Sequence, residues 1–406
     1  MNKKSSFRPL ANDENLKTKR DSALESLLHS EHTVEIEKMA VGGAGIARIQ
    51  HQGKSVVVFV NKSAPGDSLK IKILTAEKNF LTGSIVEVIR PGPTRRLPPC
   101  IYAFRCGGCS WQQFEEAEQL RQKENLLEEL LVKFIPESNY KLQPSIASPK
   151  NFNYRNRIQL KQQGPLLGYF EDKSHEIVDI EACLIADSRI SAEIPKLKSI
   201  LKPSADTQKY ELKINQNNSF EYLKIGEKGQ GLSFSQVNAE LNLILVTKVT
   251  ELAQEINPPS LTELFAGSGN FTFELNKALP QMTIEAVELN SALTQAATQK
   301  IASSNLQKRI TFFTTDCDSY VFRRPLSGDC ILLDPPRAGC SDLILEKVIQ
   351  SKTQNILYVS CHPVSLARDL QKLALQKNGY TIKWLQIYDM FPQTDHFETL
   401  IWLQKS

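Results

Sequence analysis

The stretch Glu263-Leu264-Phe265-Ala266-Gly267-Ser268-Gly269-Asn270-Phe271 decides the fold class of this chain. It joins an apolar predicted strand, residues 261–266, to a following helix. Glycines at such a junction let the backbone approach a ligand closely at the carboxyl edge of a sheet. A Gly-x-Gly pair alone is a weak signal because it also forms ordinary tight turns, so the surrounding pattern must decide.

Downstream of this stretch, short apolar runs alternate with amphipathic ones. The predicted strands are 261–266, 283–289, 310–315, 330–334, 355–360, 381–388 and 398–403, and the predicted helices include 238–256, 292–303, 341–350 and 364–377. Alternation of buried strands with helices is typical of a doubly wound α/β sheet. We therefore expect residues 235–406 to form a Rossmann-like domain.

The second and third of these strands each end in a residue suited to a nucleoside ligand. Glu288 ends the second strand, about 20 positions after the glycine loop, where a carboxylate can hold a ribose hydroxyl pair. Asp316 follows the third strand, where it can meet an adenine amino group. A dinucleotide and S-adenosylmethionine both remain possible ligands on this evidence.

The fourth and fifth strands end in groups suited to chemistry. Asp334-Pro335-Pro336-Arg337 forms a rigid loop that resembles the substrate-side motif of methyltransferases acting on a base or an amide. Cys361 ends the fifth strand, in the position for a nucleophile, although buried cysteines are often inert packing residues. Glu398, at the start of the last strand, supplies a carboxylate for proton abstraction.

The N-terminal part of the chain has a different pattern. Residues 1–31 mix both charges with few large apolar groups and are predicted to be a flexible tail. Residues 32–91 contain five short strands (33–39, 44–50, 55–60, 68–76 and 82–90) separated by Gly- and Pro-containing turns. This spacing predicts a small closed β-barrel of the OB type, a common nucleic-acid platform, or a purely structural β-domain.

Residues 92–234 are predicted to be a central α+β domain. A helix is expected over 112–134 from its apolar stripe, and residues 154–161 alternate strictly. Strand periodicity places Arg155 and Arg157 on one face, together with Gln159 and Lys161. This cationic face is a candidate for binding phosphates, and a merely solvated face is the alternative.

Composition restricts the class of protein. The 406 residues are 41% hydrophobic and 23% charged, ordinary values for a globular protein, and the net charge of +4 does not itself imply nucleic-acid binding. We find neither an apolar run of about 20 residues nor a signal-peptide core. The expectation is a cytoplasmic protein with no membrane partner, in which disulfides are rare.

Several of these motifs together resemble one family, the RNA uracil-5 methyltransferases that use S-adenosylmethionine. The resemblance rests on residues 234–238 (Phe-Ser-Gln-Val-Asn), the glycine loop, and the segments 334–337, 360–363 and 396–398, which occur in the family's order and approximate spacing. It implies that Cys361 adds to C6 of the uracil and that Glu398 removes the C5 proton. It also implies that Phe234 stacks near the base and that the methyl donor lies among six side chains: Gln236, Phe265, Asn270, Glu288, Asp316 and Asp334.

The sequence departs from the family pattern at two positions. His362 stands where the family usually has Asn, and Phe397 where it has Val. Neither change removes a reacting group, so any effect is expected on pocket shape. The RNA cytosine-5 methyltransferases differ, because they place a cysteine after the proline of the fourth-strand loop, where this chain has Pro336.

The resemblance also extends upstream. Residues 32–90 resemble the TRAM domain, an OB-like RNA-binding module. Cys100, Cys106, Cys109 and the distant Cys183 match the four-cysteine iron–sulfur motif of many members, which implies a [4Fe–4S] cluster with a structural and RNA-positioning role. On chemistry alone, four thiolates hold zinc equally well. The remaining three cysteines, Cys317, Cys330 and Cys340, are expected to be packing residues or harmless thiols.

The resemblance implies C5 methylation of a specific uridine in structured RNA. A fused TRAM domain and the cluster motif together favour 23S ribosomal RNA. A transfer-RNA uridine-5 methyltransferase is one alternative, and a non-catalytic RNA-binding iron–sulfur protein is the other. No obligate protein partner is expected.

Overall fold

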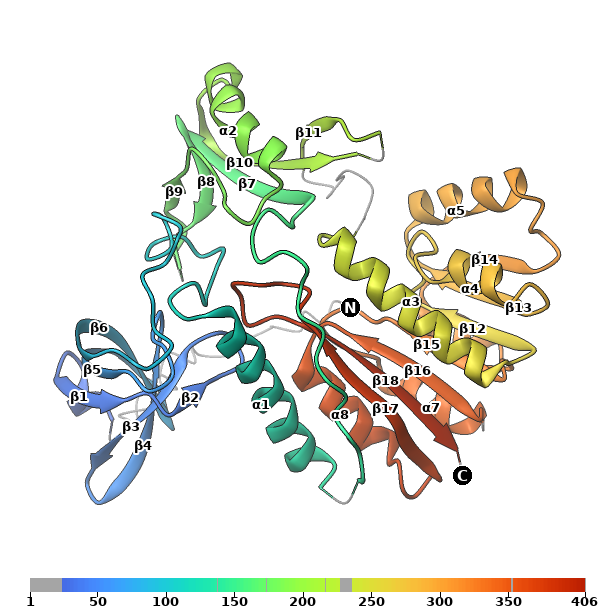
Figure 1. The fold of residues 1–406 in the computed structure, drawn as a ribbon, viewed down its shortest axis with the longest axis horizontal. Helices are drawn as coiled ribbons and strands as arrows, with labels where there is room; N and C mark the ends of the chain where they lie inside the picture. Colours follow the sequence, from blue (N-terminus) through green and yellow to red (C-terminus); the bar gives the residue numbers. More distant parts are fainter. Residues whose placement is uncertain are drawn as a thin grey trace, which may run out of the picture. The chain divides into compact units, whose positions relative to one another are not determined.

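The computed structural model describes residues 24–136, 138–172, 174–215, 217–226, 236–351 and 353–405 (Figure 1). Among these, residues 24–40 and 44–93 form one compact unit, and residues 41–43 together with those from Thr94 onward form a second. No helix among the described residues is long and apolar enough to cross a membrane.

The first unit is a curled six-stranded β-sheet. Its strands are β1 (Glu31–Glu35), β2 (Lys38–Met39), β3 (Gly45–His51), β4 (Lys54–Val60), β5 (Ser68–Ala76) and β6 (Phe80–Arg90), in the order β1-β5-β6-β4-β3-β2. The two edges of this order, β1 and β2, are separated in the chain by only Ile36 and Glu37. So short a link requires the sheet to close around on itself, as the predicted barrel does. The first predicted strand, 33–39, is therefore divided into β1 and β2.

The end of the predicted tail is folded. Residues 25–27 form a 3-10 turn, and Leu24 and Leu27 are buried. Residues 24–31 were predicted to belong to the tail, because the first 31 residues together mix both charges with few large apolar groups. Burial of the two leucines explains why they are structured, and the remainder of the predicted tail lies outside the described residues.

A buried carboxylate fixes the turn between β4 and β5. Asp67 is fully buried, and its two oxygens accept hydrogen bonds from the backbone N–H groups of Ala64 (2.6 Å) and Gly92 (2.9 Å). A Cβ atom on Gly92 would lie 2.1 Å from the carbonyl oxygen of Pro65, so only glycine fits there. Asp67 thus connects this turn to the end of the β6 segment.

The second unit contains a seven-stranded sheet at its C-terminal end. The strands are β12 (Ser260–Leu264), β13 (Thr283–Glu288), β14 (Ile310–Thr314), β15 (Cys330–Leu333), β16 (Asn355–Ser360), β17 (Tyr380–Tyr388) and β18 (Glu398–Lys405), in the order β14-β13-β12-β15-β16-β18-β17. The first five strands in this order are parallel, and β18 runs antiparallel to both β16 and β17. The predicted Rossmann-like α/β fold is confirmed.

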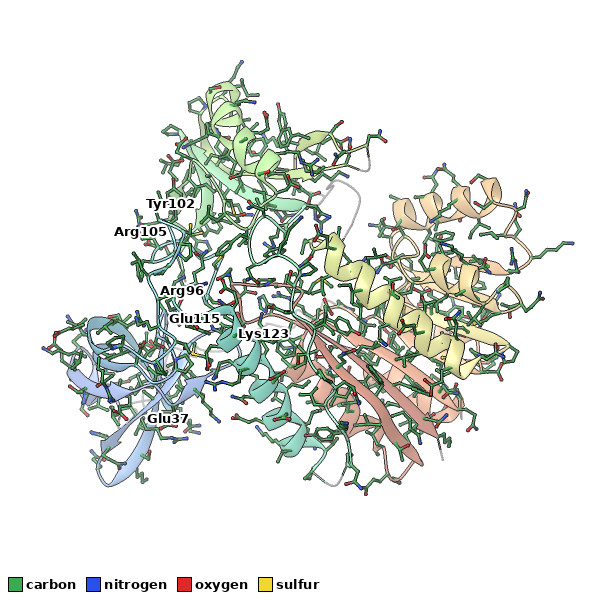
Figure 2. All side chains as sticks on the ribbon, in the orientation of Figure 1. Glu37, Arg96, Tyr102, Arg105, Glu115 and Lys123 are labelled. Carbon is green, nitrogen blue, oxygen red and sulfur yellow. The ribbon has the colours of Figure 1, made fainter. Side chains whose placement is uncertain are left out.

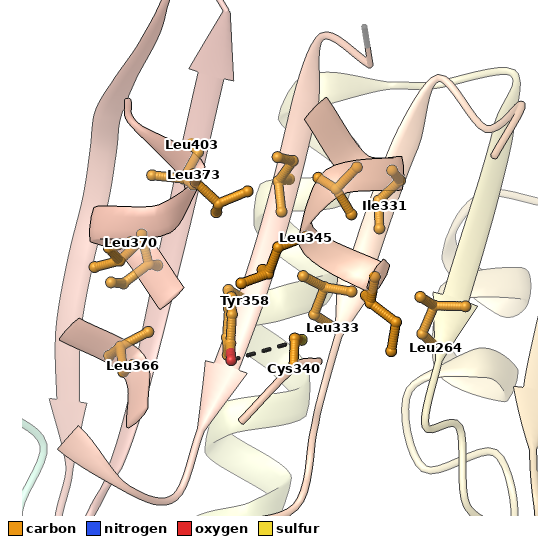
Figure 3. Packing of buried hydrophobic residues seen from close by; sticks show 14 of the residues in the cluster. Leu264, Ile331, Leu333, Cys340, Leu345, Tyr358, Leu366, Leu370, Leu373 and Leu403 are labelled. Atoms are coloured by element: carbon orange, nitrogen blue, oxygen red, sulfur yellow. Dashed lines mark hydrogen bonds between the residues drawn. The ribbon is translucent and has the colours of Figure 1, made fainter. Parts of the chain in front are cut away.

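Helices bury both faces of this sheet, because successive residues of each strand point to opposite sides. Leu333 and Tyr358 pack with α6 (Cys317–Arg323), α7 (Asp342–Ser351) and α8 (Pro363–Leu373), as Figure 3 shows for the latter two helices. Leu332 and Leu357 pack on the other face, with α3 (Ala239–Ile256) and α4 (Thr272–Ala278). The remaining helix of this region, α5 (Ser291–Ser303), packs near β14.

The three cysteines that matched no motif are part of this packing. Cys317, Cys330 and Cys340 are all buried, and the Cys340 thiol donates to the Tyr358 hydroxyl (3.8 Å; Figure 3). Their predicted role as packing residues is confirmed.

Helix α1 (Glu116–Phe134) packs against the C-terminal core rather than against the strands that follow it. Leu127 and Leu131 belong to the same apolar cluster as α7 and α8. Lys123 of α1, labelled in Figure 2, is fully buried and donates to the Asp389 carboxylate (2.5 Å) and to the carbonyl oxygen of Phe391 (3.3 Å). This buried ion pair attaches α1 to the segment between β17 and β18.

The central part of the second unit is a five-stranded antiparallel sheet in the order β11-β10-β7-β8-β9. Its strands are β7 (Arg157–Gly164), β8 (Leu166–Phe170), β9 (Ile177–Asp179), β10 (Ser204–Ile214) and β11 (Phe220–Lys224). Helix α2 (Ser188–Ile200) covers the apolar face of this sheet, which carries Ile158 and Leu160. The alternation predicted for β7 is confirmed by its burial pattern.

Candidate active site

The loop after β12 lies where the strand order reverses. The chain runs from β12 to β13 on one side, while β15 pairs with β12 on the other, and ligands of doubly wound sheets bind outside such a switch point. Phe265 (φ +65°), Gly267 (φ +58°) and Gly269 (φ +88°) all have left-handed backbone conformations. A Cβ atom on Gly269 would lie 2.5 Å from the Phe273 ring. Glycine is therefore required at 269 for this loop to pack against α4.

Glu288 ties the glycine loop to the end of β13. Its carboxylate accepts hydrogen bonds from the backbone N–H groups of Gly267 (3.0 Å) and Asn290 (2.7 Å). The acidic residue predicted to hold a ribose is thus beside the glycine loop, as the sequence order suggested.

The other residues predicted to bind the methyl donor lie at the same sheet edge or near it. Asn270 exchanges two amide hydrogen bonds with Asn242 of α3 (3.0 and 3.1 Å). Asp316 caps α6 by accepting from the backbone N–H of Ser319 (2.7 Å), and these hydrogen bonds lower its pKa. The backbone carbonyl of Gln236 accepts from the Asn156 amide (2.9 Å), which connects this residue to the central region.

Two carboxyl groups lie under this edge, the buried Glu263 and the partly exposed Asp334. Burial raises the pKa of Asp334 to about 7, and burial with a smaller contribution from Asp334 raises the pKa of Glu263 to about 8. One Glu263 oxygen accepts from the Thr272 hydroxyl (2.5 Å), whereas the other has no hydrogen-bond partner. The sequence analysis did not single out Glu263, although it lies within the stretch that decided the fold. Strand position alone gave no sign that its carboxyl group is buried.

Cys361 and Glu398 face each other across two neighbouring strands. In the antiparallel β16–β18 pair Ser360 is opposite Thr399, so continuing the register by one residue sets Cys361 opposite Glu398. Burial, Glu398 and Asp334 raise the pKa of Cys361 to about 12. Glu398 is buried with one oxygen unpaired, and burial followed by Asp334 raises its pKa well above the usual value.

Arg337 is the cation that acts on both groups. Its charge opposes the rise in pKa of Cys361 and of Glu398, and its side chain is exposed. The sequence analysis quoted Arg337 in the Asp-Pro-Pro-Arg motif but assigned it no role, because its proximity to Cys361 depends on strands β15 and β16 being neighbours.

A cavity of about 270 Å³ lies next to the loop that follows Cys361, lined by Arg337, Ala338, His362, Pro363, Asp395 and His396 among others. His362 caps α8, its Nδ1 accepting from the backbone N–H of Ser365 (3.3 Å). Burial lowers the pKa of both His362 and His396. The cavity therefore offers one permanent cation and two mainly neutral imidazoles next to the Cys361 loop.

The structure separates the predicted RNA-binding residues. Arg157 begins β7 and lies 4.0 Å from the buried Glu211 carboxylate. Arg155 lies outside the strand, with its guanidinium 5.9 Å from the Phe391 ring centre and its Nε without a hydrogen-bond partner. The prediction that both arginines share one strand face is wrong, because regular pairing starts only at Arg157. Phe234 lies outside the described residues.

The four cysteines of the predicted cluster motif line one small cavity of about 20 Å³, together with Tyr102, Gln112 and Tyr169. The Tyr102 hydroxyl (Figure 2) accepts from the backbone N–H of Glu181 (3.0 Å), which links the segment of the first three cysteines to that of Cys183. Within the part of the chain that the structure describes, no three His, Cys, Asp or Glu side chains form a group that could hold a metal ion.

Comparison with known proteins agrees with this geometry. Residues 207–406 match the tRNA (Uracil-5-)-methyltransferase family, and residues 26–86 match the TRAM domain. An uncharacterized RNA methyltransferase of Bdellovibrio bacteriovorus is 38% identical over 391 residues, covering 95% of this chain and 98% of that protein. The 23S rRNA (uracil(1939)-C(5))-methyltransferase RlmD of Legionella pneumophila is 28% identical, with coverage of 92% and 97%.

A solved structure has the same fold. The tRNA (uracil-54, C5)-methyltransferase of Pyrococcus abyssi, in complex with S-adenosyl-L-homocysteine, superposes with a TM-score of 0.70 at 20% identity, covering 92% of this chain and all of that one. Sequence, fold and the arrangement of the strand ends lead to one conclusion. The chain belongs to the RNA uracil-5-methyltransferase family, whose methyl donor is S-adenosylmethionine.

Proposed function

We propose that this enzyme methylates C5 of a uridine in 23S ribosomal RNA through a covalent adduct between Cys361 and C6. The observation that carries the mechanism is the facing pair Cys361 and Glu398, with Arg337 acting on both. The ribosomal substrate is supported by the RlmD relative and by the TRAM domain. The second candidate substrate, transfer RNA, is favoured by the fold of the Pyrococcus enzyme.

The chemistry needs a nucleophile and a base. Once Cys361 has lost its proton, its sulfur forms a bond to C6 and the electrons of the C5–C6 double bond move onto the C4 carbonyl oxygen. C5 then takes the methyl group from the sulfonium, and S-adenosylhomocysteine leaves. The Glu398 carboxylate removes the C5 proton, the double bond re-forms, and the C6–S bond breaks to restore the Cys361 thiolate.

The site's electrostatics suit this sequence of steps. A carboxylate with a raised pKa is a stronger base than an ordinary one, so burial of Glu398 favours removal of the C5 proton. Cys361 instead needs a lowered pKa, because only its thiolate is nucleophilic. Arg337 is the described cation that lowers its pKa.

The covalent step is tested with 5-fluorouridine RNA, whose C5 substituent cannot leave as a proton. The native enzyme should form a protein–RNA adduct stable on denaturing gels, and Cys361→Ala should form none while still binding S-adenosylmethionine. Glu398→Gln should accumulate the same adduct with ordinary RNA, since elimination needs the base. An adduct that persists in Cys361→Ala would overturn the nucleophile assignment. Mapping 5-methyluridine after reaction with unmodified ribosomal and transfer RNA distinguishes the two substrates.

For the methyl donor, we propose a site formed by Gln236, Phe265, Asn270, Glu288, Asp316 and Asp334. The support is their position around the β12 loop and the neighbouring strand ends. Glu288→Ala should weaken S-adenosylmethionine binding, measured by calorimetry, at least tenfold and leave RNA affinity unchanged. Equal loss of both affinities would indicate misfolding of the loop instead.

We further propose that Cys100, Cys106, Cys109 and Cys183 hold a [4Fe–4S] cluster. The support is their spacing and the single cavity that all four line. In addition, the backbone N–H of Gly108 points to the Cys106 sulfur (3.4 Å), and Arg155 is close enough to Cys109 and Cys183 to interact with both thiols. Amide donors and a nearby cation suit the negative charge that four thiolates give to such a cluster.

Metal content decides between this cluster and zinc. Protein purified without air should be brown and contain about four iron atoms per chain. Cys183→Ser should lose that iron, whereas Cys330→Ser, at a buried packing cysteine, should keep it. Colourless protein with one zinc ion would contradict the cluster and leave the methyltransferase proposal intact.

Three predictions from the sequence remain part of this proposal. They are the division at residues 31, 91 and 234, a cytoplasmic location, and RNA contacts made by Phe234, Arg155 and Arg157. For Arg155, its position beside the cysteine cavity favours charge compensation over contact with RNA.

A further inference from the structure

One face of the central five-stranded sheet carries a row of cations. Helix α2 covers the opposite, apolar face through Ile190, Ile194 and Leu197. On the other face, the register of β7 with β10 sets three pairs of side chains opposite each other: Arg157 with Lys213, Gln159 with Glu211, and Lys161 with Lys209. The sequence predicted the cations that β7 contributes to this row. Only the observed strand pairing shows that β10 adds further cations opposite them.

The first two pairs are balanced by acidic residues. Glu211 lies 4.0 Å from Arg157 and accepts a hydrogen bond from Gln159 (2.7 Å). Lys213 lies 3.9 Å from Glu221 of β11. Each cation in this part of the face therefore has an acidic neighbour.

The Lys161–Lys209 pair is different. Among the residues that the structure describes, neither ammonium group has an ion pair, and the pKa of Lys161 is lowered, first by partial burial and then by Lys209. Like charges directly opposite on neighbouring strands destabilise a sheet. An anion placed between the two ammonium groups would remove this repulsion.

An aromatic ring completes the feature. The Lys161 ammonium lies 5.7 Å from the centre of the Phe170 ring on β8, and the ring of Phe170 contacts that of His175 edge-on at 5.4 Å. Cations that track a phosphate backbone beside aromatic rings are the usual composition of RNA-binding sheet surfaces.

We propose that Lys161 and Lys209 together bind backbone phosphate of the RNA substrate, so that the central sheet forms a second RNA-contacting surface away from the Cys361 site. This inference rests on the proposed function for the identity of the ligand as RNA. The unfavourable pairing of the two lysines in the free protein then serves substrate binding.

Binding and stability should change in opposite directions when this pair is altered. Lys209→Glu places a carboxylate opposite Lys161, which exchanges repulsion for a cross-strand ion pair and should raise the melting temperature. The same variant should bind RNA about tenfold more weakly. The milder Lys209→Gln should weaken binding several-fold and reduce the slope of log affinity against log salt by about one, the value for one lost phosphate contact. Loss of affinity with a gain in stability cannot come from misfolding.

The probe is a fluorescent, unmodified RNA stem-loop with uridines in its loop, measured by anisotropy at several salt concentrations. Lys224→Gln is the matched control, because Lys224 lies on the adjacent strand β11, opposite Tyr210 and therefore on the other face of the sheet. An equal loss of affinity in Lys209→Gln and Lys224→Gln, or an unchanged salt slope in Lys209→Gln, would overturn the proposal. The proposal would also fail if Lys209→Gln weakened the binding of polyglutamate but not of RNA. That result would indicate that the face binds an acidic protein.

Methylation need not be measured, so this test is independent of the catalytic proposal. If the native protein binds the stem-loop through the lysine pair yet makes no 5-methyluridine, the proposed function fails and the RNA surface stands. If it methylates RNA while Lys209→Gln binds like the native protein, only the surface fails.

Discussion

Substitution of Glu263 by Gln should make the free enzyme more stable at alkaline pH. In the folded protein the pKa of Glu263 is about 8, against an ordinary value of 4.5, with burial as the main cause. Between these two values the folded state holds a proton that the unfolded state has released. The free energy of unfolding therefore falls by up to about 1.4 kcal/mol for each unit of rising pH.

The full shift of about 3.5 pH units corresponds to about 5 kcal/mol, an upper estimate. A glutamine side chain is not charged at any pH, so Glu263→Gln should remove this slope. The new amide oxygen can still accept from the Thr272 hydroxyl, and the NH₂ group replaces the oxygen that has no partner. We expect the variant and the native protein to differ little near about pH 5.5. Near about pH 8, the variant should be more stable by about 3 kcal/mol.

The assay is chemical denaturation without methyl donor, followed by tryptophan fluorescence at several pH values. Trp384 and Trp402 lie in β17 and β18, so the signal reports mainly on the sheet that contains Glu263. Thr272→Val is the comparison variant, because it removes the hydrogen bond to Glu263 but keeps the titrating group. A stability difference between Glu263→Gln and native protein that does not grow with pH would refute the buried-acid reasoning.

Three further predictions concern other parts of the molecule. Alkylation of Cys361 by iodoacetamide, followed by peptide mass spectrometry, should accelerate about tenfold per pH unit up to at least about pH 10, because its pKa is about 12; a plateau near pH 9 would contradict this. Lys123→Met leaves the Asp389 carboxylate buried without its cation and should lower the free energy of unfolding by about 3–5 kcal/mol. Adding Asp389→Asn to this variant should restore part of that loss. Asp67→Ala removes two buried hydrogen bonds to a charged group and should destabilise the β1–β6 unit by about 2–4 kcal/mol in thermal unfolding. Glu77→Ala, at an exposed position of the same unit, should be near neutral.

Sequence periodicity predicted the C-terminal sheet well because its strands are buried on both faces. The run 330–334, for example, packs Ile331 and Leu332 into different apolar clusters, so the strand residues of this run are all apolar. The partner of α1 was not predictable in this way. Leu127 and Leu131 form an apolar stripe, but a stripe does not say whether it packs on the central strands or, as observed, beside α8.

The strand-end residues of the site were also foreseeable, since parallel strands bring their carboxyl ends to one edge. That Cys361 and Glu398 face each other could not be predicted. It requires β18 to lie antiparallel between β16 and β17 in the sheet. Sequence order gave no indication of that placement. The same limit applies to Lys161 and Lys209, whose repulsion exists only in the observed register of β7 and β10.

The charges of the site fit a cationic methyl donor better than they fit the empty protein. Three carboxyl groups have raised pKa values, those of the buried Glu263 and Glu398 and of the partly exposed Asp334, and Asp334 contributes to the shift of the other two. A fold selected for stability alone would place uncharged side chains here, since burial disfavours the ionised form of each acid. S-adenosylmethionine carries a sulfonium, an ammonium and a carboxylate group, so its net charge is +1. Its arrival would favour the ionised carboxylates, which is the state that the proposed mechanism requires of Glu398.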